Sequence, residues 1–179
     1  MDARHYWVMK GCLRNRYDRN GDILGFVQSK EMGYWYQSQR LNKNVQKGDR
    51  IFCWRGYPHC DVVGLAEIKE IDQYDHSLRE HAFIVKPLCW FPYFIHKADL
   101  EKAFHRFLRK SKAPSFLGPG PQQTIQPIND EHAKIIAFQI IKSNNELPVA
   151  SEAMKTLFSW FPSMNPQRRS PTSQPGKSP

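Results

Sequence analysis

The sequence feature that most constrains the fold is a pair of short apolar runs separated by a turn. Residues 50–54 read RIFCW and residues 62–68 read VVGLAEI, and both runs are rich in β-branched and aromatic residues. The segment between them contains Gly56 and Pro58, which favour a loop. The two runs are therefore predicted to be neighbouring strands. Gly64, inside the second run, indicates a bulge or a close approach of another backbone.

The rest of the chain continues with strands and then becomes helical. Further strands are predicted at residues 5–10, 34–37, 81–93 and 124–128. Helices are predicted at residues 97–110, from the capping residue Asn129 to Asn144, and at residues 151–160. Residues 23–30 fit either a short helix or a strand. Strands followed by helices are typical of an α+β fold, here best closed as a small barrel.

Length and charge set the domain organisation and the kind of partner. The chain has 179 residues and a formal net charge of +9. We predict a domain at residues 1–145, a helical extension at 146–161 and a disordered, Pro/Ser-rich basic tail at 162–179. The tail adds only three positive charges and no acid, so most of the positive charge lies in the body. An anionic partner such as nucleic acid explains this charge, and so does a surface that merely favours Lys and Arg.

Several function classes lack their sequence signatures. The cysteines Cys12, Cys53, Cys60 and Cys89 form no Cys-x-x-Cys pair, and no spacing suits a zinc site. The chain carries no nucleophile elbow, metalloprotease helix or phosphate loop, so we expect no catalytic residue, no metal and no cofactor. Without a signal-peptide core or a membrane-length apolar stretch, we expect an intracellular protein, in cytoplasm or nucleus, with free thiols and no membrane contact.

Several blocks of the chain, in matching order, resemble the EVE domains of the PUA-like superfamily, which also includes the YTH and ASCH domains. The first block, residues 5–10, is similar to the opening strand of the family. The second block is Tyr36-Gln37, which is followed by Gly48-Asp49-Arg50 twelve residues after Tyr36. The others are residues 52–55 and 63–67, which resemble paired strands, and residues 125–128 before the last helix. One block differs, because family members often have a Trp-acidic-Gly-Val-Arg-Asn run where this chain has Met32-Gly33-Tyr34-Trp35. The resemblance implies a PUA-like pseudo-barrel of about five to six strands with flanking helices.

The resemblance also implies a recessed pocket that accepts a single nucleobase, for example a methylated one, from DNA or RNA. Aromatic faces hold such a base, a few polar groups read its edge, and cations hold the phosphates. The candidate pocket residues are Trp35, Tyr36, Gln37, Ser38, Trp54 and Trp90. The candidate phosphate contacts are Arg40, Lys43, Lys47 and Arg55, with a second basic set at Lys102, Arg106, Arg109, Lys110 and Lys112. Core packing, or a solvated basic face, is the competing interpretation for each of them.

Three hypotheses follow for the function. The first is a non-catalytic nucleic-acid-binding module that recognises a modified base in an aromatic pocket. The second is an enzyme or a binder of a small molecule or nucleotide that uses the same cavity, because a PUA-like barrel does not fix its function. The third is a protein-interaction adaptor, in which the Pro-rich loop and tail recruit a partner.

Overall fold

The computed structural model describes residues 5–11, 22–37, 44–71, 81–108, 114–117, 125–149 and 151–168. The strands are β1 (Tyr6–Gly11), β2 (Gly33–Gln37), β3 (Arg50–Arg55), β4 (Asp61–Ile71), β5 (His81–His96) and β6 (Ile125–Ile128). The helices are α1 (Ile23–Ser29), α2 (Lys97–Phe107), α3 (Asp130–Ser143) and α4 (Glu152–Trp160), with short 3-10 turns η1 (Ser115–Leu117), η2 (Pro162–Met164) and η3 (Pro166–Arg168). No helix in these ranges is both long and apolar enough to cross a membrane.

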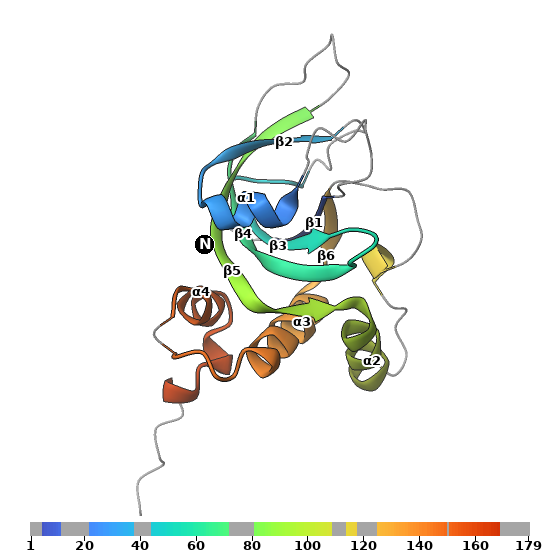
Figure 1. Cartoon of the computed structure of the whole chain (residues 1–179), viewed down its shortest axis with the longest axis vertical. Coiled ribbons are helices and arrows are strands. Elements are labelled where there is room, and N and C mark those ends of the chain that lie inside the picture. The colour runs from blue at the N-terminus through green and yellow to red at the C-terminus, as the bar shows by residue number, and fades with distance from the viewer. Residues whose placement is uncertain are drawn as a thin grey trace, which may run out of the picture.

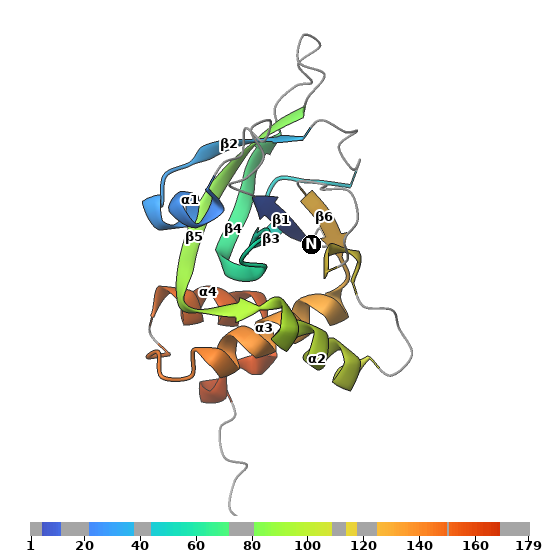
Figure 2. The same ribbon diagram turned by 45° about the vertical axis from the view of Figure 1, so that its right-hand side comes forward.

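All six strands form one curled sheet in the order β2-β5-β4-β3-β1-β6. The pair β1 and β3 is parallel, and every other neighbouring pair is antiparallel. The sheet curls around α1, while α2, α3 and α4 gather on its other side (Figure 1 and Figure 2). This arrangement confirms the predicted α+β pseudo-barrel of five to six strands with flanking helices.

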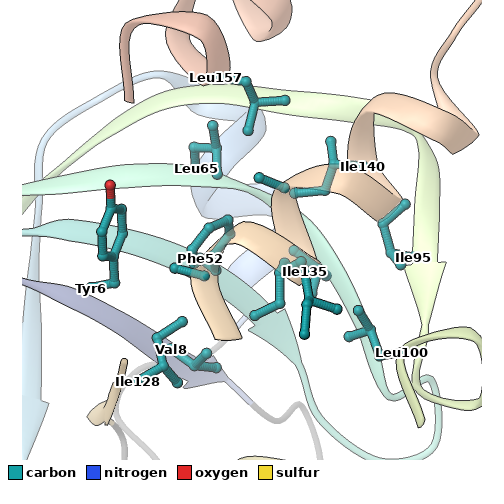
Figure 3. Close-up of a cluster of buried hydrophobic side chains, with 14 of the residues drawn as sticks. Tyr6, Val8, Phe52, Leu65, Ile95, Leu100, Ile128, Ile135, Ile140 and Leu157 are labelled. Carbon is teal, nitrogen blue, oxygen red and sulfur yellow. The ribbon is translucent and has the colours of Figure 1, made fainter. Parts of the chain in front are cut away.

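Two hydrophobic clusters lie on the opposite faces of this sheet, because successive side chains of a strand point to opposite faces. In β1, Tyr6 and Val8 belong to the cluster that packs against α2, α3 and α4, which we call the helix-side cluster (Figure 3). Trp7 and Met9 belong to the cluster that packs against α1, which we call the barrel-side cluster. A residue's position in its strand therefore decides which of the two clusters it joins.

Gly64 marks the point where this alternation breaks in β4. The register of β4 shifts on both sides, between Cys53 and Trp54 of β3 and between Val62 and Gly64 opposite β5. A Cβ atom at Gly64 would lie 2.5 Å from the backbone oxygen of Cys89, closer than real Cβ contacts. Both predictions from the sequence, a bulge and a close backbone approach, are confirmed at this glycine.

Residues 23–30, which fit a helix or a strand equally well, form the helix α1. The Asp22 side chain caps it by accepting a hydrogen bond from the backbone N–H of Leu24, at 3.0 Å. Ile23 and Val27, four residues apart, are its buried positions, as expected for one face of a helix. Lys30 ends the helix with a left-handed φ of 59°.

The second half of β5 lies at an edge of the sheet, because β2 pairs only with its first five residues. Asn144, at the end of α3, covers part of this edge. Its side chain accepts a hydrogen bond from the N–H of Tyr93 at 3.2 Å and donates to the oxygen of the same residue at 3.0 Å. It thus satisfies backbone groups that a further strand would otherwise pair. Pro87 and Pro92 lie beyond the five residues of β5 that β2 pairs with, as the sequence predicted for an edge or bent strand.

The C-terminal helix α4 is packed into the same core as the barrel. Leu157 and Trp160 belong to the helix-side cluster, where the Trp160 ring meets those of Tyr6 and Phe52 at 6.3 and 5.8 Å between centroids. Beyond it, residues 162–168, which the sequence predicted to be disordered, form the turns η2 and η3. Residues 169–179 of the predicted tail lie outside the described part of the chain.

Candidate nucleic-acid interface

Trp35 is the predicted pocket residue that lies inside the barrel. It is on β2 opposite Phe83 of β5, is only 2% exposed, and belongs to the barrel-side cluster. The ring of Phe26, from α1, packs on it at 5.6 Å with a tilt of 53°. Its indole N–H is buried and has no hydrogen-bond acceptor among the described residues. A buried donor without an acceptor is rare and marks a place where a ligand or an ordered water can bind.

Asp49, in the turn before β3, organises the polar end of the same cluster. Its carboxylate is almost fully buried and accepts hydrogen bonds from the indole N–H of Trp7 at 2.8 Å and from the backbone N–H groups of His5 at 3.0 Å and Gln46 at 2.9 Å. The imidazole of His5 lies 3.6 Å away. Asp49 therefore fixes the starts of β1 and β3 against each other, and its oxygens are occupied by structural donors.

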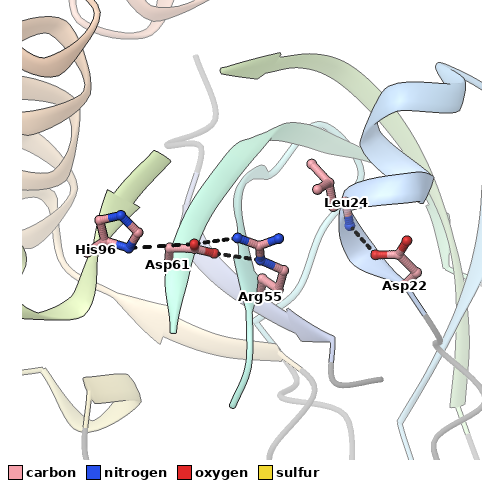
Figure 4. A network of polar contacts seen from close by, with 5 residues as sticks. All are labelled: Asp22, Leu24, Arg55, Asp61 and His96. Carbon is pink, nitrogen blue, oxygen red and sulfur yellow. Dashed lines mark hydrogen bonds and ion pairs between the residues drawn. The ribbon is translucent and has the colours of Figure 1, made fainter. Parts of the chain in front are cut away.

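Arg55, predicted as a phosphate contact, is instead paired inside the protein. Its guanidinium donates two hydrogen bonds to the fully buried carboxylate of Asp61, at 2.9 and 2.6 Å (Figure 4). The same guanidinium stacks at 4.8 Å over the ring of Phe94. His96 approaches the same carboxylate at 3.7 Å. Such a bidentate pair holds Arg55 in place and neutralises its charge, so this residue is poorly suited to a phosphate.

Lys10, at the end of β1, is a partly buried cation that the sequence analysis did not single out. It is partly buried and forms no ion pair within the described ranges. Burial lowers the pKa of its amine from the ordinary value of 10.5; the neighbouring Cys60 thiol acts in the opposite direction, and Lys97 lowers the pKa further. The loop that carries Cys60 is tied to the end of β1, because the N–H of Gly56 donates to the oxygen of Gly11 at 2.7 Å. Lys10 follows Tyr6 and Val8 in the alternation of β1, so it lies on the helix-side face of the sheet, opposite Trp35.

Among the other predicted residues that the structure describes, Trp54 lies apart from Trp35. Trp54 is 3% exposed and belongs to the helix-side cluster, where its ring packs at 5.5 Å on Phe116, so it lies on the opposite face of the sheet. Trp90 is 40% exposed on β5, and Lys47 is exposed in the turn before β3. Tyr36 and Gln37 follow Trp35 on β2. Ser38, Arg40 and Lys43 lie outside the described residues, as do Arg109, Lys110 and Lys112 of the second basic set.

The burial of Lys10 predicts an amine whose pKa is lower than that of an exposed lysine. We expect its rate of acylation by acetic anhydride, followed by mass spectrometry as a function of pH, to have a midpoint below 10.5, because burial favours the neutral, reactive form. In denaturant the midpoint of the same residue should return to about 10.4, the value for an exposed lysine. A native midpoint at or above the denatured one would contradict the described burial of this side chain.

Comparison with known proteins identifies the fold. No protein-family model matches the chain, and no curated protein matches it in sequence. Human THYN1, whose structure was solved in complex with DNA containing 5-methylcytosine, is 14% identical over 74% of this chain and 95% of that chain, with a TM-score of 0.58. A Pseudomonas syringae protein is 14% identical over 75% of this chain and 99% of that chain, with a TM-score of 0.55.

These similarities define the class of protein: the chain has the PUA-like fold. A variant of the ASCH protein from Zymomonas mobilis also has it, at 12% identity, with 75% of this chain and 98% of that chain covered and a TM-score of 0.50. Within this class the fold is that of the DUF55, or EVE, domain of human thymocyte nuclear protein 1. The two chains are 16% identical, with a TM-score of 0.55 over 73% of this chain and 95% of that chain. The resemblance predicted from the sequence blocks is thus confirmed at the level of the fold.

Proposed function

We propose that this protein is a nucleic-acid-binding module that takes up one base, methylated or otherwise modified, beside Trp35 in the interior of the barrel. The observation that carries the proposal is the buried indole N–H of Trp35, which has no acceptor among the described residues. Leaving a buried donor unsatisfied costs about 1 to 3 kcal/mol. A carbonyl oxygen or ring nitrogen of an inserted base would remove this cost.

The aromatic environment of Trp35 supports a base as the ligand. Trp35 and Phe26 present two large rings at 5.6 Å on one side of the barrel interior. Stacking on an aromatic side chain contributes about 1 to 3 kcal/mol per base. A methyl group on the base adds apolar area that such rings can cover. The fold neighbour human THYN1, solved with DNA containing 5-methylcytosine, makes a modified base in DNA the first ligand to test.

Cations at the barrel supply the expected phosphate contacts. Lys47, which is exposed in the turn before β3, carries this part of the proposal among the described residues, whereas Lys10 lies on the helix-side face of β1, opposite Trp35. Arg40 and Lys43 remain predicted contacts, and Arg55 is committed to Asp61. Phosphate contacts of this kind make affinity fall with salt concentration.

We further propose that the module binds without catalysis and works inside the cell. Asp49 and Asp61, the two buried carboxylates, are occupied by structural donors and an arginine, which leaves neither free as a general base. Cys53, Cys60 and Cys89 are free thiols, as is usual in a reducing compartment.

The test compares variants at two buried tryptophans that lie on opposite faces of the sheet, Trp35 and Trp54. Trp35→Phe removes the donor while keeping an aromatic ring, and we expect it to weaken binding of the preferred modified oligonucleotide about tenfold, the equivalent of one hydrogen bond of about 1.4 kcal/mol. Trp54→Phe is the matched control and should leave affinity unchanged, because that ring lies in the helix-side cluster. Fluorescence anisotropy would use DNA and RNA oligonucleotides with unmodified cytosine and adenine, 5-methylcytosine, 5-hydroxymethylcytosine or 6-methyladenine, at two salt concentrations.

The outcomes separate the competing functions. Selective binding to one modification that is lost in Trp35→Phe supports the proposal and names the ligand. Binding that ignores modification and falls steeply with salt leaves only a basic surface. Salt-insensitive affinity for a free nucleoside would instead favour a small-molecule site beside Trp35.

A further inference from the structure

A groove with apolar walls lies on the helical half of the molecule, away from the barrel interior. It encloses about 300 Å³ between the end of α3, the turn that follows it, α4 and the turns η2 and η3. Its apolar lining consists of Ile141, Leu147, Val149, Met154, Phe158, Met164 and Pro166. The two methionines are flexible, polarizable side chains, which adapt well to the shape of a partner's apolar residues.

The wall of the groove formed by α3 and its following turn is held in position by hydrogen bonds. The fully buried side chain of Asn144 forms two hydrogen bonds with the backbone of Tyr93 on β5. It also donates a hydrogen bond to the oxygen of Ile140 at 3.0 Å. The N–H of Leu147 donates to the oxygen of Asn144, also at 3.0 Å. The groove is therefore formed before any partner binds, which lowers the entropic cost of binding.

An exposed aromatic pair continues the apolar surface along α3. Phe138 lies one helical turn before Ile141, a rise of about 4.5 Å, and is 46% exposed. Its ring meets that of Phe107, from α2, edge to face at 5.9 Å, and Phe107 is 49% exposed. Two phenylalanines that pack on each other and still face solvent extend the groove into a continuous apolar strip across two helices.

Cations without partners border this strip. Lys134 and Lys142 lie four residues before and after Phe138, hence on the same face of α3, and both are exposed. Arg106 lies 5.7 Å over the ring of Phe107. None of the three forms an ion pair within the described part of the chain. The acids beside the strip are Asp130 and Glu131, in the first turn of α3, and Glu146, in the turn after it.

We infer that this strip docks an amphipathic helical segment of another protein, with apolar residues one turn apart and acidic residues beside them. One apolar side chain would enter the groove at Ile141 and the next would cover Phe138, while carboxylates would pair with Lys134, Lys142 and Arg106. The apolar lining decides against nucleic acid, which has no aliphatic side chain to place there. The strip lies on the face of the sheet opposite Trp35, so this interaction is independent of the proposed base site.

The test selects partners directly on the full-length protein. A display library of random 16-residue peptides, about four helical turns in length, would be panned on the wild-type protein. The selected peptides would then be synthesised, and their affinities would be measured by fluorescence anisotropy. We expect the selected peptides to combine Leu, Ile or Phe at helical spacing with Asp or Glu. Phe138→Ser should weaken their binding at least about fivefold, and the double reversal Lys134→Glu with Lys142→Glu at least about tenfold.

A charge reversal elsewhere provides the matched control. Lys86→Glu, on β5, changes the net charge by the same amount as one of the α3 substitutions and should leave peptide affinity unchanged. Three results would overturn the inference: no peptide enriched above an unrelated basic protein, selected peptides without acids, or affinity that Phe138→Ser does not change. A Phe138-dependent affinity for single-stranded oligonucleotides without any selected peptide would also overturn it, and would assign the aromatic pair to base stacking instead.

Discussion

Replacing Gly64 with alanine is expected to destabilise the protein by more than about 3 kcal/mol, at or beyond the upper end of the usual cost of overpacking a core. The new Cβ would lie 2.5 Å from the oxygen of Cys89, 3.3 Å from the Cα of Trp90 and 3.2 Å from a methyl group of Val27. Two of these three atoms belong to the backbone of β5, so a change of rotamer cannot relieve the contact. The strands must separate, which breaks the pairing between β4 and β5.

Urea unfolding followed by circular dichroism would measure this loss, with Gly25→Ala as the matched control. At Gly25 the closest atom to a new Cβ is a side-chain oxygen of Asp22 at 2.9 Å, on the side chain that caps α1. Relieving this contact costs at most that cap, about 0.5 to 2 kcal/mol. Alanine in a helix is also favoured over glycine by about 0.5 to 1 kcal/mol. The control should therefore stay within about 1 kcal/mol of wild type. Equal unfolding midpoints for the two variants would mean that β4 and β5 are not as close at Gly64 as described.

Asp49→Ala is the second substitution with a large expected effect. It removes the acceptor of three donors at once, the indole N–H of Trp7 and the backbone N–H groups of His5 and Gln46. A buried donor left without a partner costs about 1 to 3 kcal/mol, and the partly buried N–H groups of His5 and Gln46 cost less because water can reach them, so we expect a total loss of about 3 to 5 kcal/mol. The Trp7 N–H is the most deeply buried of the three, because Trp7 is only 1% exposed.

The control for Asp49 is another aspartate, Asp130, in the first turn of α3. It is exposed, and its replacement by alanine loses only a favourable interaction with the helix dipole, worth about 0.3 to 1 kcal/mol. Thermal unfolding monitored through tryptophan fluorescence would report both the stability and the environment of Trp7. If Asp49→Ala unfolded at the same temperature as Asp130→Ala, the carboxylate would not be the organising acceptor of this turn.

Local patterns in the sequence predicted most of the fold. Strand and helix positions followed from the spacing of apolar residues, and Gly64, Pro87 and Pro92 indicated where the sheet bends, bulges or ends. The helix α1 could not be decided from its own residues, because seven residues are too few for periodicity to distinguish a helix from a strand. Its Asp22 cap and its burial against the barrel settle the choice.

The candidate site was harder to predict, since its residues come together only through tertiary structure. Trp54 shares a strand face with Phe52, so the alternation within residues 50–54 already indicated the helix-side cluster, but the sequence does not say on which face a pocket lies. The ion pair of Arg55 with Asp61 could have been predicted from the sequence, because the predicted hairpin makes the two residues cross-strand neighbours of opposite charge. Lys10 had no such signal, since Cys60 and Lys97, which act on the pKa of its amine, lie far along the chain.

The packing of Trp160 on Tyr6 has a consequence for how the protein is made on the ribosome. Tyr6 lies on β1, and its hydroxyl donates to the backbone oxygen of Trp160, 154 residues later, at 3.4 Å. The aromatic face of Tyr6 and Phe52 therefore stays uncovered until α4 has been translated. The barrel is incomplete until then, and a chain that ends near residue 145 would leave this apolar surface exposed to chaperones and proteases.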